Sequence, residues 1–173
     1  DTYAALFATT KKGEPGIVCI IGTGSNCSFY DGEQIEQKVT SLGYILMDDA
    51  SGNYYGRQLL RDFHFNKIPQ DLAYEFAKQF DLTAETIKNH LYKKPNPNTY
   101  LAQFARFLIT NKEHEYCQKL IRKGLKLFIE HQILQFKQAH DVPAHFVGSI
   151  AFYLQEELKS LLKQEKTLNF KSG

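Results

Sequence analysis

An uninterrupted apolar run at residues 17–21, Ile-Val-Cys-Ile-Ile, constrains the fold of this chain more than any other feature. Glycines bound the run on both sides, which is typical of a β-strand buried on both faces. Residues 26–30 then alternate like a second strand, and Asp31-Gly32 favours a type I′ hairpin turn, which needs positive φ at both central positions. With a third strand over residues 33–39, the sequence predicts a three-stranded antiparallel meander.

The rest of the chain is mostly helical in pattern. Helices are expected over residues 1–10, 51–63, 69–80, 83–92, 100–109, 113–138 and 150–163. Short strands are expected over 145–148 and from residue 167 onward. This order predicts an α/β fold in which a βαβ unit extends the meander and residues 66–112 form an inserted helical region. Because a terminal strand needs neighbours, we expect the chain to be one lobe of a longer protein.

Composition and charge exclude several classes of protein. Apolar residues make up 43% and charged residues 23%, which argues against disorder. The formal charge is only +2 and no charge block stands out, so neither a nucleic acid nor a membrane is an expected partner. Three dispersed cysteines favour reduced thiols in a cytoplasmic protein. The scattered histidines predict no metal site of the zinc type.

The turn Gly22-Thr23-Gly24-Ser25 is the strongest candidate binding motif that the residues provide. It is not a dinucleotide fingerprint, since a strand follows it and a third glycine is missing, and it lacks the lysine of a Walker A loop. A tight turn with two glycines exposes backbone N–H groups toward one point, and Thr23 and Ser25 add hydroxyl donors. Such a turn can hold a phosphate, although an ordinary glycine-rich hairpin explains it as well.

Three motifs in order carry a family resemblance: Asp1 with Ala4-Ala5, the segment 22–32 with its Gly-Thr-Gly-Ser-Asn-Cys and Asp-Gly, and the segment 42–52. Together they resemble the N-acetylglucosamine kinase and BadF-type ATPase family, within the actin-like ATPase and sugar-kinase superfamily. The resemblance implies that residues 1–173 form a ribonuclease H-like, actin-type C-terminal lobe. Its partners would be the N-terminal lobe of the same protein and a small-molecule sugar.

The same resemblance implies the chemistry. ATP and Mg²⁺ would be the cofactors, and an amino sugar, most simply N-acetylglucosamine, would become its 6-phosphate. Asp1 stands where the family has its catalytic base, which accepts the proton of the attacking hydroxyl; a helix cap is the alternative. The sugar would lie against Asp1, Ser41, Leu42, Gly43 and Asp48. Asp49 is expected to cap the helix that follows.

ATP would contact several glycines. Its β- and γ-phosphates are expected at Gly22, Thr23, Gly24 and Ser25. Gly124, which follows the basic pair Arg122-Lys123, resembles a small residue beside the adenine, but a helix crossing explains it equally well. Gly148 and Ser149 follow a strand and open a helix, so they could receive a phosphate or ribose oxygen; Ser149 as an N-cap is the alternative.

Departures from the family pattern keep other functions open. Met47, Asp49 and Ala50 stand where the family has Gly, Glu and Gly, and Leu42 replaces an aromatic residue. A noncatalytic sugar- or nucleotide-binding regulator therefore remains an alternative. A BadF-type activator of a dehydratase is another, but its iron–sulfur cluster needs paired cysteines that this sequence does not offer. The sequence also leaves open a homodimer formed through helices between residues 66 and 140.

Overall fold

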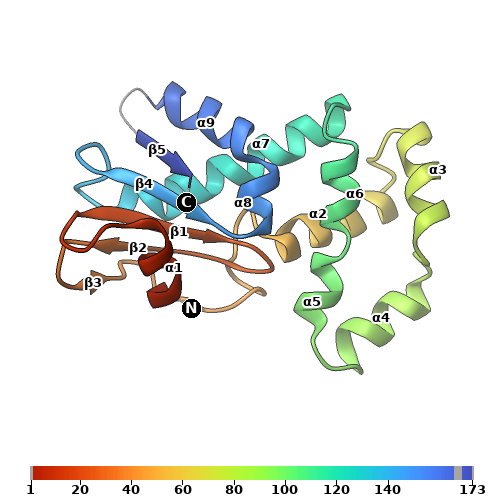
Figure 1. Ribbon diagram of the computed structural model, residues 1–173. Coiled ribbons are helices and arrows are strands. Elements are labelled where there is room, and N and C mark those ends of the chain that lie inside the picture. Colours follow the sequence, from red (N-terminus) through yellow and green to blue (C-terminus); the bar gives the residue numbers. More distant parts are fainter. Residues whose placement is uncertain (1, 166–168, 173) are drawn as a thin grey trace.

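The computed structural model describes residues 2–165 and 169–172, and Figure 1 shows a β-sheet flanked by helices, with a further group of helices beside it. Within these residues, five strands form one sheet in the order β3-β2-β1-β4-β5. They are β1 (Gly16–Ile21), β2 (Ser25–Tyr30), β3 (Ile35–Glu36), β4 (Pro143–Val147) and β5 (Asn169–Ser172). β2 runs antiparallel to β1 and β3, whereas β1, β4 and β5 run parallel. The fold is mixed α/β, with the predicted meander and its parallel extension both present.

Helices cover both faces of the sheet. On one face lies α1 (Thr2–Thr9), whose Ala5 packs with Val18 and Tyr30. The other face carries the main core, where Ile17 and Ile21 pack among side chains of α7 (Glu115–His131) and α9 (Gln155–Gln164). Strand β1 is therefore buried from both sides, as its continuous apolar sequence predicts.

Residues 66–112 contain four helices: α3 (Gln70–Gln79), α4 (Ala84–Tyr92), α5 (Pro97–Ala102) and α6 (Ala105–Thr110). They lie beside the sheet, on the side away from β3 (Figure 1). Aromatic rings hold them together, and Phe76 contacts Phe80, Phe104 and Phe107 with centroids 4.7 to 5.9 Å apart. Whether this segment is an insertion relative to other proteins stays a prediction.

Helices α2 (Gly52–His64) and α7 run antiparallel against each other. Near the end of α2, the Tyr116 hydroxyl donates to the Asp62 carboxylate at 2.7 Å. In the first turn of α2, the Tyr55 hydroxyl donates to the Ile121 carbonyl at 2.8 Å. The hydrogen bond between Tyr55 and Ile121 holds the start of α2 against α7. The start of α2 borders the candidate site described below.

The predicted hairpin turn is wrong in type. Only Gly32 has a positive φ, of 110°, so Asp31-Gly32 does not form a type I′ turn. Instead, the Asp31 carboxylate accepts the N–H groups of Glu33 and Gln34, both at 2.7 Å. A four-residue loop stabilised by an aspartate side chain results. The third strand is also shorter than predicted, since β3 has only two residues.

Three predicted helices end or break earlier than their apolar periodicity suggests. The helix predicted over 100–109 is divided between α5 and α6, and the helix over 150–163 between α8 (Ser149–Tyr153) and α9. Phe104 and Leu154, at the breaks, are buried, so the apolar pattern continues while the backbone turns. The helix over 113–138 stops at His131 and continues as a short 3-10 turn, Ile133–Gln135. None of the helices in the described part of the chain is both long and apolar enough to cross a membrane.

Candidate functional site

The glycine turn after β1 is fixed by the start of α2. The N–H groups of Gly52 and Asn53 donate to the carbonyls of Gly22 and Thr23, at 2.7 and 3.0 Å. The Gly22 N–H donates to the Gly24 carbonyl at 2.9 Å. Within the described residues, the N–H groups of Thr23 and Gly24 donate to no other group. The turn therefore has its carbonyls occupied and two amides left for an anionic ligand.

A second glycine turn lies directly against the first. Gly148 follows β4 with a φ of 114°, and a Cβ at that position would lie 2.3 Å from the Ile21 carbonyl oxygen and 3.1 Å from the Gly22 nitrogen. Because β1 and β4 are parallel neighbours, their carboxyl ends meet at the same edge of the sheet. The structure thus brings together the predicted turns at Gly22–Ser25 and Gly148–Ser149. The N-cap of α8 is Gly148, so the alternative role of Ser149 as N-cap is wrong.

Asp48 lies against the glycine turn. A Cβ at Gly24 would come within 2.6 Å of the Asp48 Oδ2 atom, so a larger residue at position 24 would displace this carboxylate. The Asn53 side-chain amide donates to the same oxygen at 3.2 Å. Ser41, Leu42 and Gly43, the other predicted sugar contacts, are exposed on the loop that precedes Asp48. The structure therefore places one acidic side chain of the predicted sugar loop next to the predicted phosphate turn.

The predicted cap of α2 is wrong. Ser51, not Asp49, is the N-cap: its hydroxyl accepts the Tyr54 N–H at 3.1 Å. Asp49 instead contacts His131, at the end of α7, with 2.8 Å between Oδ2 and Nδ1. The Asp49 carbonyl also accepts the Ser25 hydroxyl at 2.7 Å. Ser25 therefore joins the glycine turn to the predicted sugar loop, and the contact of Ser25 with ATP stays a prediction.

Asp1 lies outside the described residues, so its predicted roles as base and sugar ligand stay predictions. Gly124 is buried, and a Cβ there would lie 2.6 Å from the Tyr55 hydroxyl and 2.7 to 2.8 Å from the rings of Tyr55 and Tyr54. The crossing of α2 and α7 thus accounts for this glycine. Its predicted contact with adenine stays untested and has no support from its surroundings.

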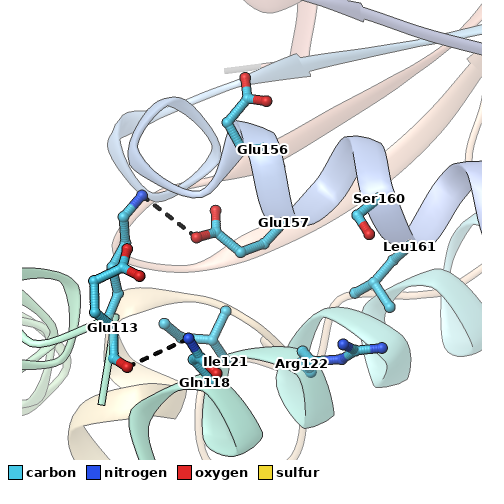
Figure 2. A pocket seen from close by; sticks show the side chains of 9 residues that line it. Glu113, Gln118, Ile121, Arg122, Glu156, Glu157, Ser160 and Leu161 are labelled. Carbon is cyan, nitrogen blue, oxygen red and sulfur yellow. Dashed lines mark hydrogen bonds and ion pairs between the residues drawn. The ribbon is translucent and has the colours of Figure 1, made fainter. Parts of the chain in front are cut away.

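Figure 2 shows a cleft between α7 and α9, with a volume of about 320 Å³, that Arg122 lines. Gly124 does not line it. Arg122 does, but so do the carboxylates Glu113, Glu156 and Glu157, of which only Glu157 contacts a lining cation, Lys112, at 3.4 Å. Three carboxylates in one cleft repel phosphates, so this cleft is a poor candidate for ATP.

A larger cleft, of about 960 Å³, adjoins Ser149. It lies between α6 and α8, and its lining includes the apolar side chains of Phe107, Ile109 and Ile150. Arg106 contributes the only charged side chain among its described lining residues. The size and lining suit a nucleoside, which needs apolar walls and a few polar groups. The sequence analysis missed the α6 residues because a continuous helix over 100–109 gave no reason to single out Arg106.

Among the described residues, no group of three or more His, Cys, Asp or Glu side chains gathers closely enough to hold a metal ion. Asp48 is the carboxylate that lies against the glycine turn. A Mg²⁺ ion at this site would therefore take most of its ligands from phosphates and water, which Mg²⁺ tolerates well.

Comparison with solved structures finds proteins that are named as kinases. The structure of a "Putative N-acetylglucosamine Kinase" from Porphyromonas gingivalis matches 99% of this chain with a TM-score of 0.88 and 33% sequence identity. The chain is similar to it in both fold and sequence. A protein of the same name from Chromobacterium violaceum matches 98% of the chain with a TM-score of 0.74 and 16% identity, which shows a shared fold alone.

The chain spans 58% of the length of each of these two proteins. No protein-family model and no curated protein matches it.

Proposed function

We propose that this chain is the C-terminal lobe of an ATP-dependent amino-sugar kinase, with a ribonuclease H-like, actin-type fold. In the complete protein it would help to convert N-acetylglucosamine to its 6-phosphate. One observation carries the proposal: two glycine turns meet at the carboxyl edge of parallel strands, and Asp48 lies against one of them. The 33% identity to a protein named for this activity supports the same conclusion.

The glycine turn would hold the terminal phosphates of ATP. The free N–H groups of Thr23 and Gly24 and the exposed Thr23 hydroxyl are the donors in reach of one anion. Gly148 and Ser149 would face the ribose or the α-phosphate, since Gly148 touches Gly22. The nucleoside would enter the cleft beside Ser149, where Arg106 could stack on a base.

The sugar would lie on the other side of the turn, at Asp48 and the loop Ser41-Leu42-Gly43. The Asp48 carboxylate would repel a phosphate bound at the neighbouring glycine turn unless hydrogen-bond donors or a cation lay between the two groups. Sugar hydroxyls are such donors, and a carboxylate can accept two of them. This arrangement would bring the accepting hydroxyl beside the γ-phosphate, which is the main task of a phosphoryl-transfer site.

In the reaction, the sugar hydroxyl oxygen forms the new bond to the γ-phosphorus while the bond from that phosphorus to ADP breaks. The hydroxyl proton passes to a carboxylate, and Asp1 has this role by resemblance. Bound Mg²⁺ would neutralise charge on the phosphates. The other lobe would supply the remaining ATP contacts, so we expect the 173-residue chain alone to be catalytically inactive.

The test is ADP production by the complete protein with Mg-ATP and a sugar panel: N-acetylglucosamine, N-acetylmannosamine, glucosamine, glucose and N-acetylmuramic acid. We expect sugar-dependent ADP, greatest with N-acetylglucosamine. The Asp1→Asn variant should lose about 100-fold or more in kcat, since general-base catalysis contributes about 10²–10⁴. The Asp141→Asn variant, which alters an exposed aspartate outside the site, should retain full activity.

Other outcomes would point to the alternatives. Sugar-independent ADP would favour an ATPase activator, although all three cysteines are buried, which leaves no exposed thiol pair for a cluster. Sugar binding in a calorimeter without ADP would favour a noncatalytic regulator. Equal activity of the Asp1→Asn variant and the parent protein would refute the assignment of Asp1.

A further inference from the structure

A cleft of about 340 Å³ lies between α2 and α7, at the far end of α2 from the candidate site. Arg61, which lines it, is about 14 Å along the helix from Gly52, at 1.5 Å per residue. None of the described residues that line this cleft belongs to the glycine turns or the sugar loop. The candidate site therefore does not explain which side chains line this cleft.

Four cations line this cleft: Arg61, Lys67, Lys119 and Lys123. Lys119 is paired with Glu115 at 2.9 Å on the helix surface. The other three have no carboxylate partner within the described residues. A chain whose formal charge is only +2 thus gathers several unpaired cations in one place.

Among the described lining residues Asp62 is the only acidic one, and no ion pair joins it to these cations. Its carboxylate accepts the Tyr116 hydroxyl at 2.7 Å. The dipole of α2 favours a cation at its C-terminal end and so accounts for Arg61. It does not account for Lys67, which follows the helix, or for Lys123 in the middle of α7.

An exposed aromatic ring lies among the cations. Phe65 is 61% exposed, with the Arg61 guanidinium 5.3 Å and the Lys67 ammonium 6.0 Å from its centroid. The face of a sugar or of a base can pack on such a ring, while a phosphate beside it would meet the cations. An inorganic anion would use the cations alone and leave the ring exposed.

We propose that this cleft binds a small organic phosphate ester, with its phosphate at Arg61, Lys67 and Lys123 and its organic part on Phe65. The two residues of the basic pair, Arg122 and Lys123, line different clefts. Adjacent positions on a helix face different directions, so Lys123 lines this cleft while Arg122 lines the acidic one in Figure 2. Sugar phosphates and nucleoside monophosphates share the required chemistry.

The test is calorimetric titration of the 173-residue chain with three probes: inorganic phosphate, N-acetylglucosamine 6-phosphate and AMP. Arg61→Gln with Lys123→Gln forms the cleft variant. Lys88→Gln with Lys137→Gln removes the same charge from exposed positions outside the cleft and is the matched control. We expect an ester to bind more tightly than inorganic phosphate, and about tenfold more weakly in the cleft variant than in the control, as for loss of charge-assisted hydrogen bonds.

The ester that binds more tightly identifies the ligand as a sugar phosphate or a nucleotide. In the Phe65→Ser variant, the difference in affinity between this ester and inorganic phosphate should become smaller. Three results would overturn the proposal: no binding of either ester, equal binding of inorganic phosphate and the esters, or equal weakening in the cleft and control variants. AMP bound equally by all variants would place AMP elsewhere, and would also count against this cleft. Because the titration requires no turnover, failure here is distinguishable from failure of the proposed kinase activity.

Discussion

The contact between the two glycine turns can be tested by adding one methyl group. In Gly148→Ala the new Cβ would lie 2.3 Å from the Ile21 carbonyl oxygen, where van der Waals contact begins near 3.4 Å. The φ of 114° adds a second penalty, since side chains rarely adopt that backbone conformation. The backbone term costs about 1–3 kcal/mol, and overpacking costs about 1–3 kcal/mol more.

The Gly13→Ala variant separates the backbone penalty from the steric penalty. Gly13 also has a positive φ, of 88°, but a Cβ there would meet nothing within 4 Å. Both variants should carry the backbone penalty, and only Gly148→Ala should carry the steric one. We therefore expect Gly148→Ala to be less stable than Gly13→Ala by about 1–3 kcal/mol, which lowers Tm by about 2–4 °C per kcal/mol in a chain of this size.

The assay is urea unfolding followed by circular dichroism, with Cm and m compared across the parent chain and both variants. The same samples can be titrated with Mg-ATP, and Gly148→Ala should bind it more weakly than Gly13→Ala because its turn is displaced. If the two variants are equally stable, the turns are not in contact as described. If Gly148→Ala binds Mg-ATP normally despite lost stability, the second turn is not part of the nucleotide site.

Three further predictions concern single side chains. Tyr55→Phe removes a buried hydrogen bond to Ile121 and should lower the free energy of unfolding by about 1 kcal/mol, measured in urea. Burial and the Asp62 carboxylate raise the pKa of Tyr116, so the protonated hydroxyl stabilises the folded state below the ordinary tyrosine pKa, near 10. The free energy of unfolding should therefore fall as the pH rises above that value. Urea unfolding from pH 8 to 11 measures this fall, which should be less steep in Tyr116→Phe. Burial raises the pKa of Cys117 to about 11, so native protein at pH 8 should resist iodoacetamide at this thiol until urea unfolds it, as followed by mass spectrometry.

The sheet was predictable because its signals are local. The apolar run of β1 needs burial on two faces, and the glycines around it mark where the strand begins and ends. The turn after it could be assigned from the same residues. The hairpin type at Asp31 could not, because an aspartate side chain that accepts two backbone N–H groups competes with the type I′ turn that Asp-Gly usually favours.

The parts of the site that sequence reasoning missed depend on long-range contacts. Asp49 meets His131 across 82 positions in the sequence, and no periodicity predicts that pair. The crossing that explains Gly124 depends on how α2 packs against α7, which the spacing of apolar residues does not determine. Likewise, Arg106 lines a cleft together with residues of α8, which lie far from it in the sequence.

The loop over residues 41–50 shows why a departure from the pattern that the sequence resembles need not change the conformation of the backbone. Asp48 and Ala50 both have left-handed backbone conformations, with φ of 66° and 62°. Aspartate tolerates this region, but alanine pays about 1–2 kcal/mol for it, which explains why the related pattern has glycine at position 50. The conformation is nevertheless retained, because the Ser25 hydroxyl holds the Asp49 carbonyl and the Ser51 N–H donates to the Asp48 carbonyl at 3.2 Å. These bonds on either side of Ala50 keep the Asp48 carboxylate against Gly24, so the substitution affects the stability of the loop more than its shape.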